Sequence, residues 1–99
     1  SHNAKGEVCV CRNATEAAKK FKPGQILVVP FTTNDTLPFM REAAGIITEE
    51  AGTNSHSAIV GLTLDKAVIV GATNATRTLK DGMTSSMDGA RGVVQAMAK

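Results

Sequence analysis

Residues 46–64 read Ile-Ile-Thr-Glu-Glu-Ala-Gly-Thr-Asn-Ser-His-Ser-Ala-Ile-Val-Gly-Leu-Thr-Leu, and this stretch indicates the fold most clearly. The short β-branched run at 46–48 is typical of a buried strand. The polar, glycine-bearing segment that follows predicts a loop over 49–54. The last part predicts a helix over 56–64 with an apolar face wide enough to pack on a sheet. We expect that face to include Ala58, Ile59, Val60, Leu62 and Leu64.

One histidine, His56, stands where this loop meets the helix. The side-chain oxygen of Asn54 or Ser55 is placed to cap the helix, because it can accept a bond from an unpaired backbone N–H. Free amides and the positive end of the helix dipole favour an anion beside His56. The position suits an imidazole that carries a phosphoryl group, and it suits equally well an ordinary polar residue at a helix start.

Further strands and helices are expected to alternate on either side of this unit. The patterns predict strands at 7–11, 25–30, 46–48 and 67–70, and helices at 13–21, 37–44, 56–64 and 75–80. Residues 83–97 predict two antiparallel strands joined through 88–92. The fold class is therefore α/β, with a mixed, mostly parallel sheet, helices packed outside it and a C-terminal β-hairpin.

Local signals mark several helix ends. Asn13 and Glu16 form a plausible capping box, and the polar cluster 32–35 is placed to cap the second helix. Pro38 is tolerated there because it falls in the first turn. Asn74 is expected to cap the short helix that follows the fourth strand.

Composition limits the classes of function. The chain has 99 residues, which suits one domain; we expect residues 1–4 to be a remnant of an expression tag and 5–99 to be a single domain. There is no Trp or Tyr, and only three Phe, so stacking on nucleic-acid bases is disfavoured. The net charge is +2, and the densest cations, Lys19, Lys20 and Lys22, are expected at a solvated helix end. No membrane span or leader is apparent, so we expect a cytoplasmic protein without nucleic-acid or membrane partners.

Other site chemistries find little support in the sequence. Cys9 and Cys11 share one face of a predicted strand, and we expect free thiols there because an i, i+2 disulfide is too constrained. A metal site needs about four ligands, and His56 is the only further credible one. Ser55 and Ser57 flank His56, but adjacent residues on a helix point apart, so a nucleophilic triad is disfavoured.

The stretch from Gly24 to Val94 resembles the swivelling phosphohistidine domain of phosphoenolpyruvate (PEP)-utilising enzymes. The matching segments are residues 24–30, 44–50, 55–60, 67–71, 75–76, 80–82 and 87–89, in the order typical of that family. The resemblance implies a β/β/α fold in which His56 accepts a phosphoryl group. It implies further that Gly52, Thr53, Asn54 and Ser55 bind phosphate.

The chain also departs from the phosphocarrier pattern. Ala51 replaces a glycine, Asn54 stands in place of a threonine, and Gly61-Leu62 stands where carriers have Ala-Arg. These features are most similar to the extra C-terminal domain of some bacterial pyruvate kinases. That similarity implies a structural or regulatory role, with phosphate or PEP binding at His56. The alternative is a true phosphocarrier of the pyruvate phosphate dikinase or PEP synthase type.

The resemblance carries expectations about cofactors and partners. We expect no cofactor or metal in this domain, with Mg²⁺ and K⁺ used elsewhere in the parent enzyme. The expected partners are the remaining domains or neighbouring subunits of that parent. The isolated domain is not expected to turn over a substrate.

Overall fold

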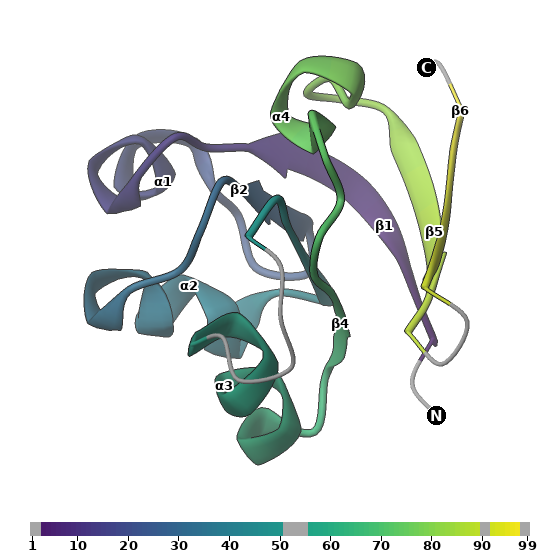
Figure 1. The fold of residues 1–99 in the computed structure, drawn as a ribbon. Helices are drawn as coiled ribbons and strands as arrows, with labels where there is room; N and C mark the ends of the chain where they lie inside the picture. Colours follow the sequence, from purple (N-terminus) through teal and green to yellow (C-terminus); the bar gives the residue numbers. More distant parts are fainter. Residues whose placement is uncertain (1–2, 51–55, 90–91, 98–99) are drawn as a thin grey trace.

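Six strands form one curled sheet in the order β4-β3-β2-β1-β5-β6 (Figure 1). The computed structural model describes residues 3–50, 56–89 and 92–97. The strands are β1 Asn3–Val10, β2 Ile26–Val29, β3 Gly45–Thr48, β4 Ala67–Ile69, β5 Thr84–Asp88 and β6 Val93–Met97. β1 to β4 are parallel, whereas β5 and β6 pair antiparallel. The mixed, mostly parallel sheet and its closing hairpin were both predicted correctly.

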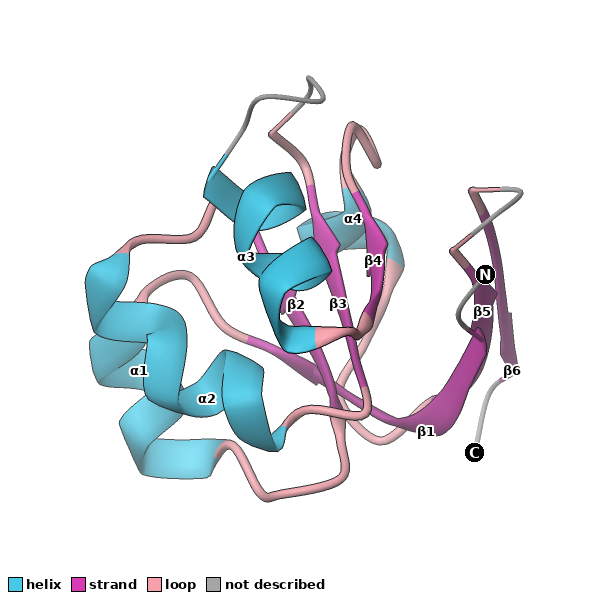
Figure 2. Cartoon of the chain, turned by 90° about the horizontal axis from the view of Figure 1, so that it is seen from below, coloured by secondary structure: helices cyan, strands magenta, loops and turns pink. Residues whose placement is uncertain are grey.

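The helices lie in the connections. They are α1 Ala14–Lys20, the 3₁₀ turn η1 Asn34–Thr36, α2 Leu37–Glu42, α3 His56–Leu64 and α4 Ala75–Thr78. Figure 2 shows α1, α2 and α3 on one side of the parallel strands. None of the helices in the described ranges is long and apolar enough to cross a membrane.

β1 belongs to two pairings at once. Its second half, Val8 to Val10, pairs parallel with β2, and its first half, Asn3 to Glu7, pairs antiparallel with β5. Asn3 and Ala4 therefore form part of the sheet, opposite Asp88 and Met87. Whatever their origin, Asn3 and Ala4 extend the sheet, although their sequence predicted no strand there.

Two apolar cores lie on the two faces of the parallel strands. In β2, Ile26 and Val28 face the layer formed by the hairpin and α4, whereas Leu27 and Val29 face the helices. All four are fully buried because the strand has cover on both sides. The molecule is thus built of three layers, β/β/α, as the family resemblance implied.

Two helix caps differ from the predicted ones. Asn13 does cap α1, because its side chain accepts a bond from the Glu16 N–H; the Glu16 carboxylate, however, accepts from Arg12 instead of Asn13. Asn74 makes no side-chain cap and adopts a left-handed backbone with φ 63°. Asparagine tolerates that conformation, so Asn74 turns the chain into α4 through its backbone.

The apolar face of α3 is narrower than predicted. Val60 and Leu64 pack against the helix-side core, but the side chain of Ile59 is 53% exposed. Gly61 is buried against Val68 of β4, and this close contact fixes which stripe of the helix faces the sheet. Ile59 is rotated out of that stripe. The side chains of Ala58 and Leu62 lie outside the described part of the chain.

Candidate functional site: the His56 loop

His56 is held by the loop that follows β2. Its Nδ1 lies 2.6 Å from the Thr32 hydroxyl oxygen, and its Nε2 lies 3.3 Å from the Asn34 side-chain oxygen. Thr32 is buried, Asn34 is exposed, and His56 is half-buried. Both ring nitrogens therefore have partners, and the Nδ1 contact is the tighter one.

Hydrogen bonds within the loop after β2 fix its shape independently of His56. The Thr33 N–H donates to the hydroxyl of Thr36 at 2.9 Å, and the same hydroxyl donates to the Thr33 carbonyl oxygen at 2.7 Å. Thr36 is itself buried beside Met40 of α2, so the turn is anchored to the helix-side core. Thr32 and Asn34, on either side of Thr33, are thereby presented to His56.

The two contacts permit two protonation patterns of the neutral imidazole. If Nε2 carries the proton, it donates to the Asn34 oxygen and Nδ1 accepts from the Thr32 hydroxyl. If Nδ1 carries the proton, it donates to Thr32, and the lone pair of Nε2 is available as a nucleophile. In that form the Asn34 oxygen would face the Nε2 lone pair, so the Asn34 amide either turns its NH₂ group to Nε2 or moves away from the ring. The loop is compatible with both forms.

Further hydrogen bonds lie at the carboxyl ends of the parallel strands, where the loop after β2 begins. One carboxylate oxygen of Glu49, directly after β3, accepts from the Thr76 N–H at 3.0 Å and from the Thr76 hydroxyl at 2.7 Å. The Glu50 carbonyl accepts from the Gly71 N–H. The carboxyl ends of β3 and β4 are thus tied together, next to the strand end that carries Thr32. Ligand sites in parallel sheets commonly form at this edge.

The structure tests the predicted site residues only in part. His56 begins α3, as predicted. Gly52, Thr53, Asn54 and Ser55 lie outside the described residues, so their assignment to phosphate binding stays a prediction. Thr32 and Asn34 were not predicted as site residues. Their place directly after a strand buried on both faces was the available signal.

The two cysteines form no part of this site. Cys9 and Cys11 are free and buried in the helix-side core, with their sulfur atoms 3.6 Å apart. Burial and the neighbouring thiol raise the pKa of Cys11 to about 12, so the thiol is protonated near neutral pH. Free thiols were predicted here. No cluster of three metal-ligating side chains occurs among the described residues.

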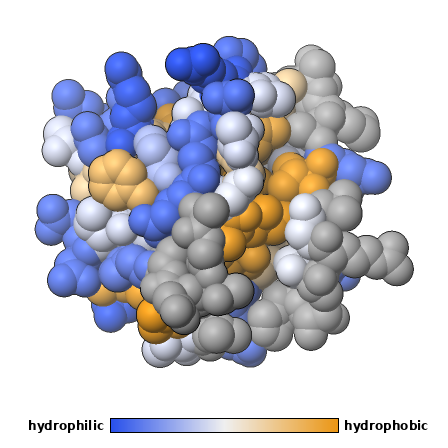
Figure 3. Space-filling view, in the orientation of Figure 1, coloured by the Kyte–Doolittle hydropathy of each residue, from blue (hydrophilic) through white to orange (hydrophobic). Residues whose placement is uncertain are grey.

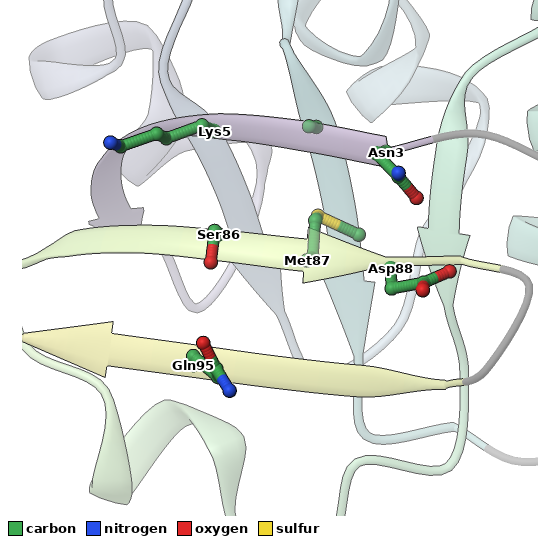
Figure 4. Close-up of a pocket in the computed structure, with 7 residues that line it drawn as sticks. Asn3, Lys5, Ser86, Met87, Asp88 and Gln95 are labelled. Carbon is green, nitrogen blue, oxygen red and sulfur yellow. The ribbon is translucent and has the colours of Figure 1, made fainter.

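A shallow hollow on the antiparallel strands is a weaker candidate. It measures about 470 Å³ and is lined by residues of β1, β5 and β6 (Figure 4). Lys5, Ser86 and Gln95 are cross-strand neighbours there. The described lining contains no histidine, so the hollow holds no phosphoryl acceptor of the kind predicted at position 56.

Comparison with known proteins identifies the class. The family described as "PEP-utilising enzyme, mobile domain" matches residues 21–92. The chain therefore belongs to this family of mobile domains. The solved structure of Enzyme I is similar at a TM-score of 0.66 and 26% identity, over 78% of this chain and 32% of that one. The aconitase X structure from Thermococcus kodakaraensis shares the fold, at a TM-score of 0.74 and 22% identity, over 99% of this chain and 92% of that one.

Two kinds of relative are similar along nearly the whole chain. A pyruvate kinase of Bacillus licheniformis is 50% identical over 92 residues, which is 93% of this chain and 16% of the relative. A phosphoenolpyruvate synthase of Aeropyrum pernix is 45% identical over 95 residues, which is 96% of this chain and 12% of the relative. The chain thus spans less than a fifth of the length of either relative.

Proposed function

We propose that the chain serves as the mobile domain of a pyruvate kinase-type parent, where it binds phosphate or PEP beside His56 and has a structural or regulatory role. The observation that carries this proposal is the position of His56: the first residue of α3, with Nδ1 2.6 Å from the Thr32 hydroxyl. The pyruvate kinase that is 50% identical to this chain favours a parent of that kind.

The geometry supports anion binding by two physical effects. The first turn of a nine-residue helix offers backbone N–H groups and the positive end of its dipole. The bond from Thr32 holds the imidazole in one orientation, which lowers the entropy lost when a ligand binds. An anion in this place accepts bonds from the helix amides, and His56 contributes an N–H from Nε2 or, when protonated, a positive charge.

A second candidate function is phosphoryl transfer through His56, and one observation favours it. In the form with Nδ1–H donating to Thr32, Nε2 has a free lone pair, and its contact to Asn34 is long at 3.3 Å. Nε2 would attack the phosphorus of a phosphoryl donor, forming the N–P bond as the P–O bond to the leaving group breaks. The PEP synthase relative, 45% identical, is consistent with this alternative.

The cofactors and neighbours of the parent belong to the same proposal. We place any Mg²⁺ and K⁺ sites of the parent in its other domains, and the partners of this domain are those domains or neighbouring subunits. Because the chain is a small share of its relatives, these assignments concern a larger protein than the one described. A cytoplasmic location is consistent with the pyruvate kinase relatives.

One experiment separates the two functions. The chain is labelled with ¹⁵N-histidine and titrated with inorganic phosphate and PEP, and the His56 ring signals are followed by NMR. The same samples are then incubated with PEP and a catalytic domain that phosphorylates a known carrier. For a binding domain we expect saturable shifts of the His56 signals and no covalent phosphate.

Acid-labile, base-stable phosphate on His56 that is absent from His56→Ala would support the phosphocarrier function and argue against a role limited to binding. Thr32→Val is the matched variant, because it keeps the side-chain shape and removes only the hydroxyl. We expect it to change the balance of the two ring tautomers and to weaken either function. Absence of both shifts and phosphorylation would refute both functions.

A further inference from the structure

A groove between α1 and α4 carries more positive charge than its own carboxylates neutralise. It measures about 450 Å³, and its walls come from the end of β1, α1, α4 and the turn that follows α4. Its charged lining consists of Arg12, Lys20, Arg77 and Lys80, with Glu16 and Asp81. Figure 3 shows a strongly hydrophilic surface over α1 and α4, which lie in the upper part of Figure 1.

Two of these cations are already paired. Lys20 Nζ lies 2.8 Å from an Asp81 carboxylate oxygen and 3.6 Å from Glu16, and Arg12 Nε lies 3.5 Å from Glu16. Asp81 also accepts from the Val10 N–H at 2.6 Å, which fixes its carboxylate at the groove. This network is close to neutral. Lys20 is therefore part of a built ion-pair network, where the sequence predicted only a solvated helix end.

Arg77 and Lys80 are the cations that remain. Both are exposed, and neither has an ion pair within the described part of the chain. With two paired carboxylates and four cations, the groove has an excess of two positive charges. The formal net charge of the whole chain is also +2, so the excess at this groove equals that of the entire molecule.

We propose that this groove binds a small organic phosphate monoester. Near pH 7 such a group carries a charge of about −2, which matches the excess of the groove. The fork of the Arg77 guanidinium can bind two phosphate oxygens, as a lysine cannot. The half-buried Val10 and the buried Leu79 supply apolar surface for the carbon part of the ligand. This site is separate from His56 and does not depend on the function proposed above.

The proposal is tested with phenyl phosphate as the probe, at low ionic strength, by ¹H–¹⁵N NMR of the whole chain. We expect saturable shifts of the amides of Thr76, Arg77 and Lys80, with a Kd on the order of 1 mM, because the groove is open to solvent. Inorganic phosphate should bind more weakly, since it lacks the carbon part. Succinate should also bind more weakly, because its two charges are spread apart.

Charge-removing variants give the matched control. Arg77→Gln/Lys80→Gln should raise the Kd at least fivefold. Lys22→Gln/Arg41→Gln removes the same charge at exposed sites outside the groove and should leave the Kd within twofold. Arg77→Lys keeps the charge but not the fork, so an intermediate Kd is expected. His56→Ala should have no effect.

Three results would overturn the proposal. The first is equal weakening in both double variants, which would mean that only net charge matters. The second is succinate or inorganic phosphate binding as tightly as phenyl phosphate. The third is a set of shifts confined to the surroundings of His56. Thermal unfolding of each variant checks that the domain is folded at the temperature of the binding measurement.

Discussion

A single methyl group added at Gly61 tests how closely α3 packs against β4. A Cβ built there lies 2.1 Å from Cγ2 and 3.0 Å from Cβ of Val68. Rotation of the Val68 side chain relieves the first contact but leaves the second, so α3 or β4 must also move. Overpacking of this kind costs about 1–3 kcal/mol. The better helix propensity of alanine returns up to about 1 kcal/mol. We therefore expect Gly61→Ala to lower the free energy of unfolding by about 1–2 kcal/mol.

The assay is urea unfolding of Gly61→Ala, Val68→Ala and the double variant. Val68→Ala removes both Cγ atoms, so the double variant should recover part of the loss. A favourable coupling of about 1 kcal/mol in this cycle would assign the loss to the Gly61–Val68 contact. NMR of His56 gives a second readout, because outward movement of α3 should lengthen its bond to Thr32. If Gly61→Ala were as stable as the unsubstituted chain, the proposed close packing of α3 against Val68 would be refuted.

Three further predictions concern the core and the groove. The Ser85 hydroxyl is buried without a hydrogen-bond partner in the described structure, so Ser85→Ala should raise the free energy of unfolding by about 1 kcal/mol in urea titrations; a loss would reveal a partner. Cys9 and Cys11 should resist a thiol reagent at pH 8 in the native state and react on unfolding, because burial raises the pKa of both thiols; rapid native labelling would contradict this. Burial tends to raise the pKa of Asp81, but the bonds from Lys20 and the Val10 N–H hold it below its usual value. The contribution of Asp81 to the free energy of unfolding should therefore be complete above about pH 4, and it should disappear as the pH falls through the lowered pKa. Since Asp81 is half-exposed, we expect only about 0.5–1 kcal/mol, absent in Asp81→Asn; identical pH profiles would exclude it.

Local patterns predicted the elements well, because their causes are local. The helix over 56–64 has the predicted bounds, because a polar, glycine-bearing sequence precedes its first residue and a turn follows its last. Asn13 caps α1 as expected from its spacing to Glu16. The complete burial of β2 follows from its continuous apolar run, which is too short for a helix.

The contacts that build the candidate site were not predictable in this way. Thr32 and Asn34 reach His56 across more than twenty residues of sequence, and Glu49 reaches Thr76 across a similar distance. Only the parallel order of the strands brings these residues to one edge. The exposure of Ile59 has the same origin: the contact between Gly61 and Val68 of β4 sets which stripe of α3 faces the sheet, and Ile59 lies outside that stripe.

The double pairing of β1 has a consequence for the order of folding. Its second half meets β2 across one short crossover, whereas its first half meets β5 only after nearly the whole chain has been traversed. The longer loop adds a closure cost on the order of 1 kcal/mol. The parallel strands can therefore assemble first, and the hairpin should dock late on a strand that is already half in place. The amide hydrogen of Cys11, which donates to the Val28 carbonyl of β2, should then exchange more slowly than the amide hydrogens of residues 3–7, which lie beside the hairpin.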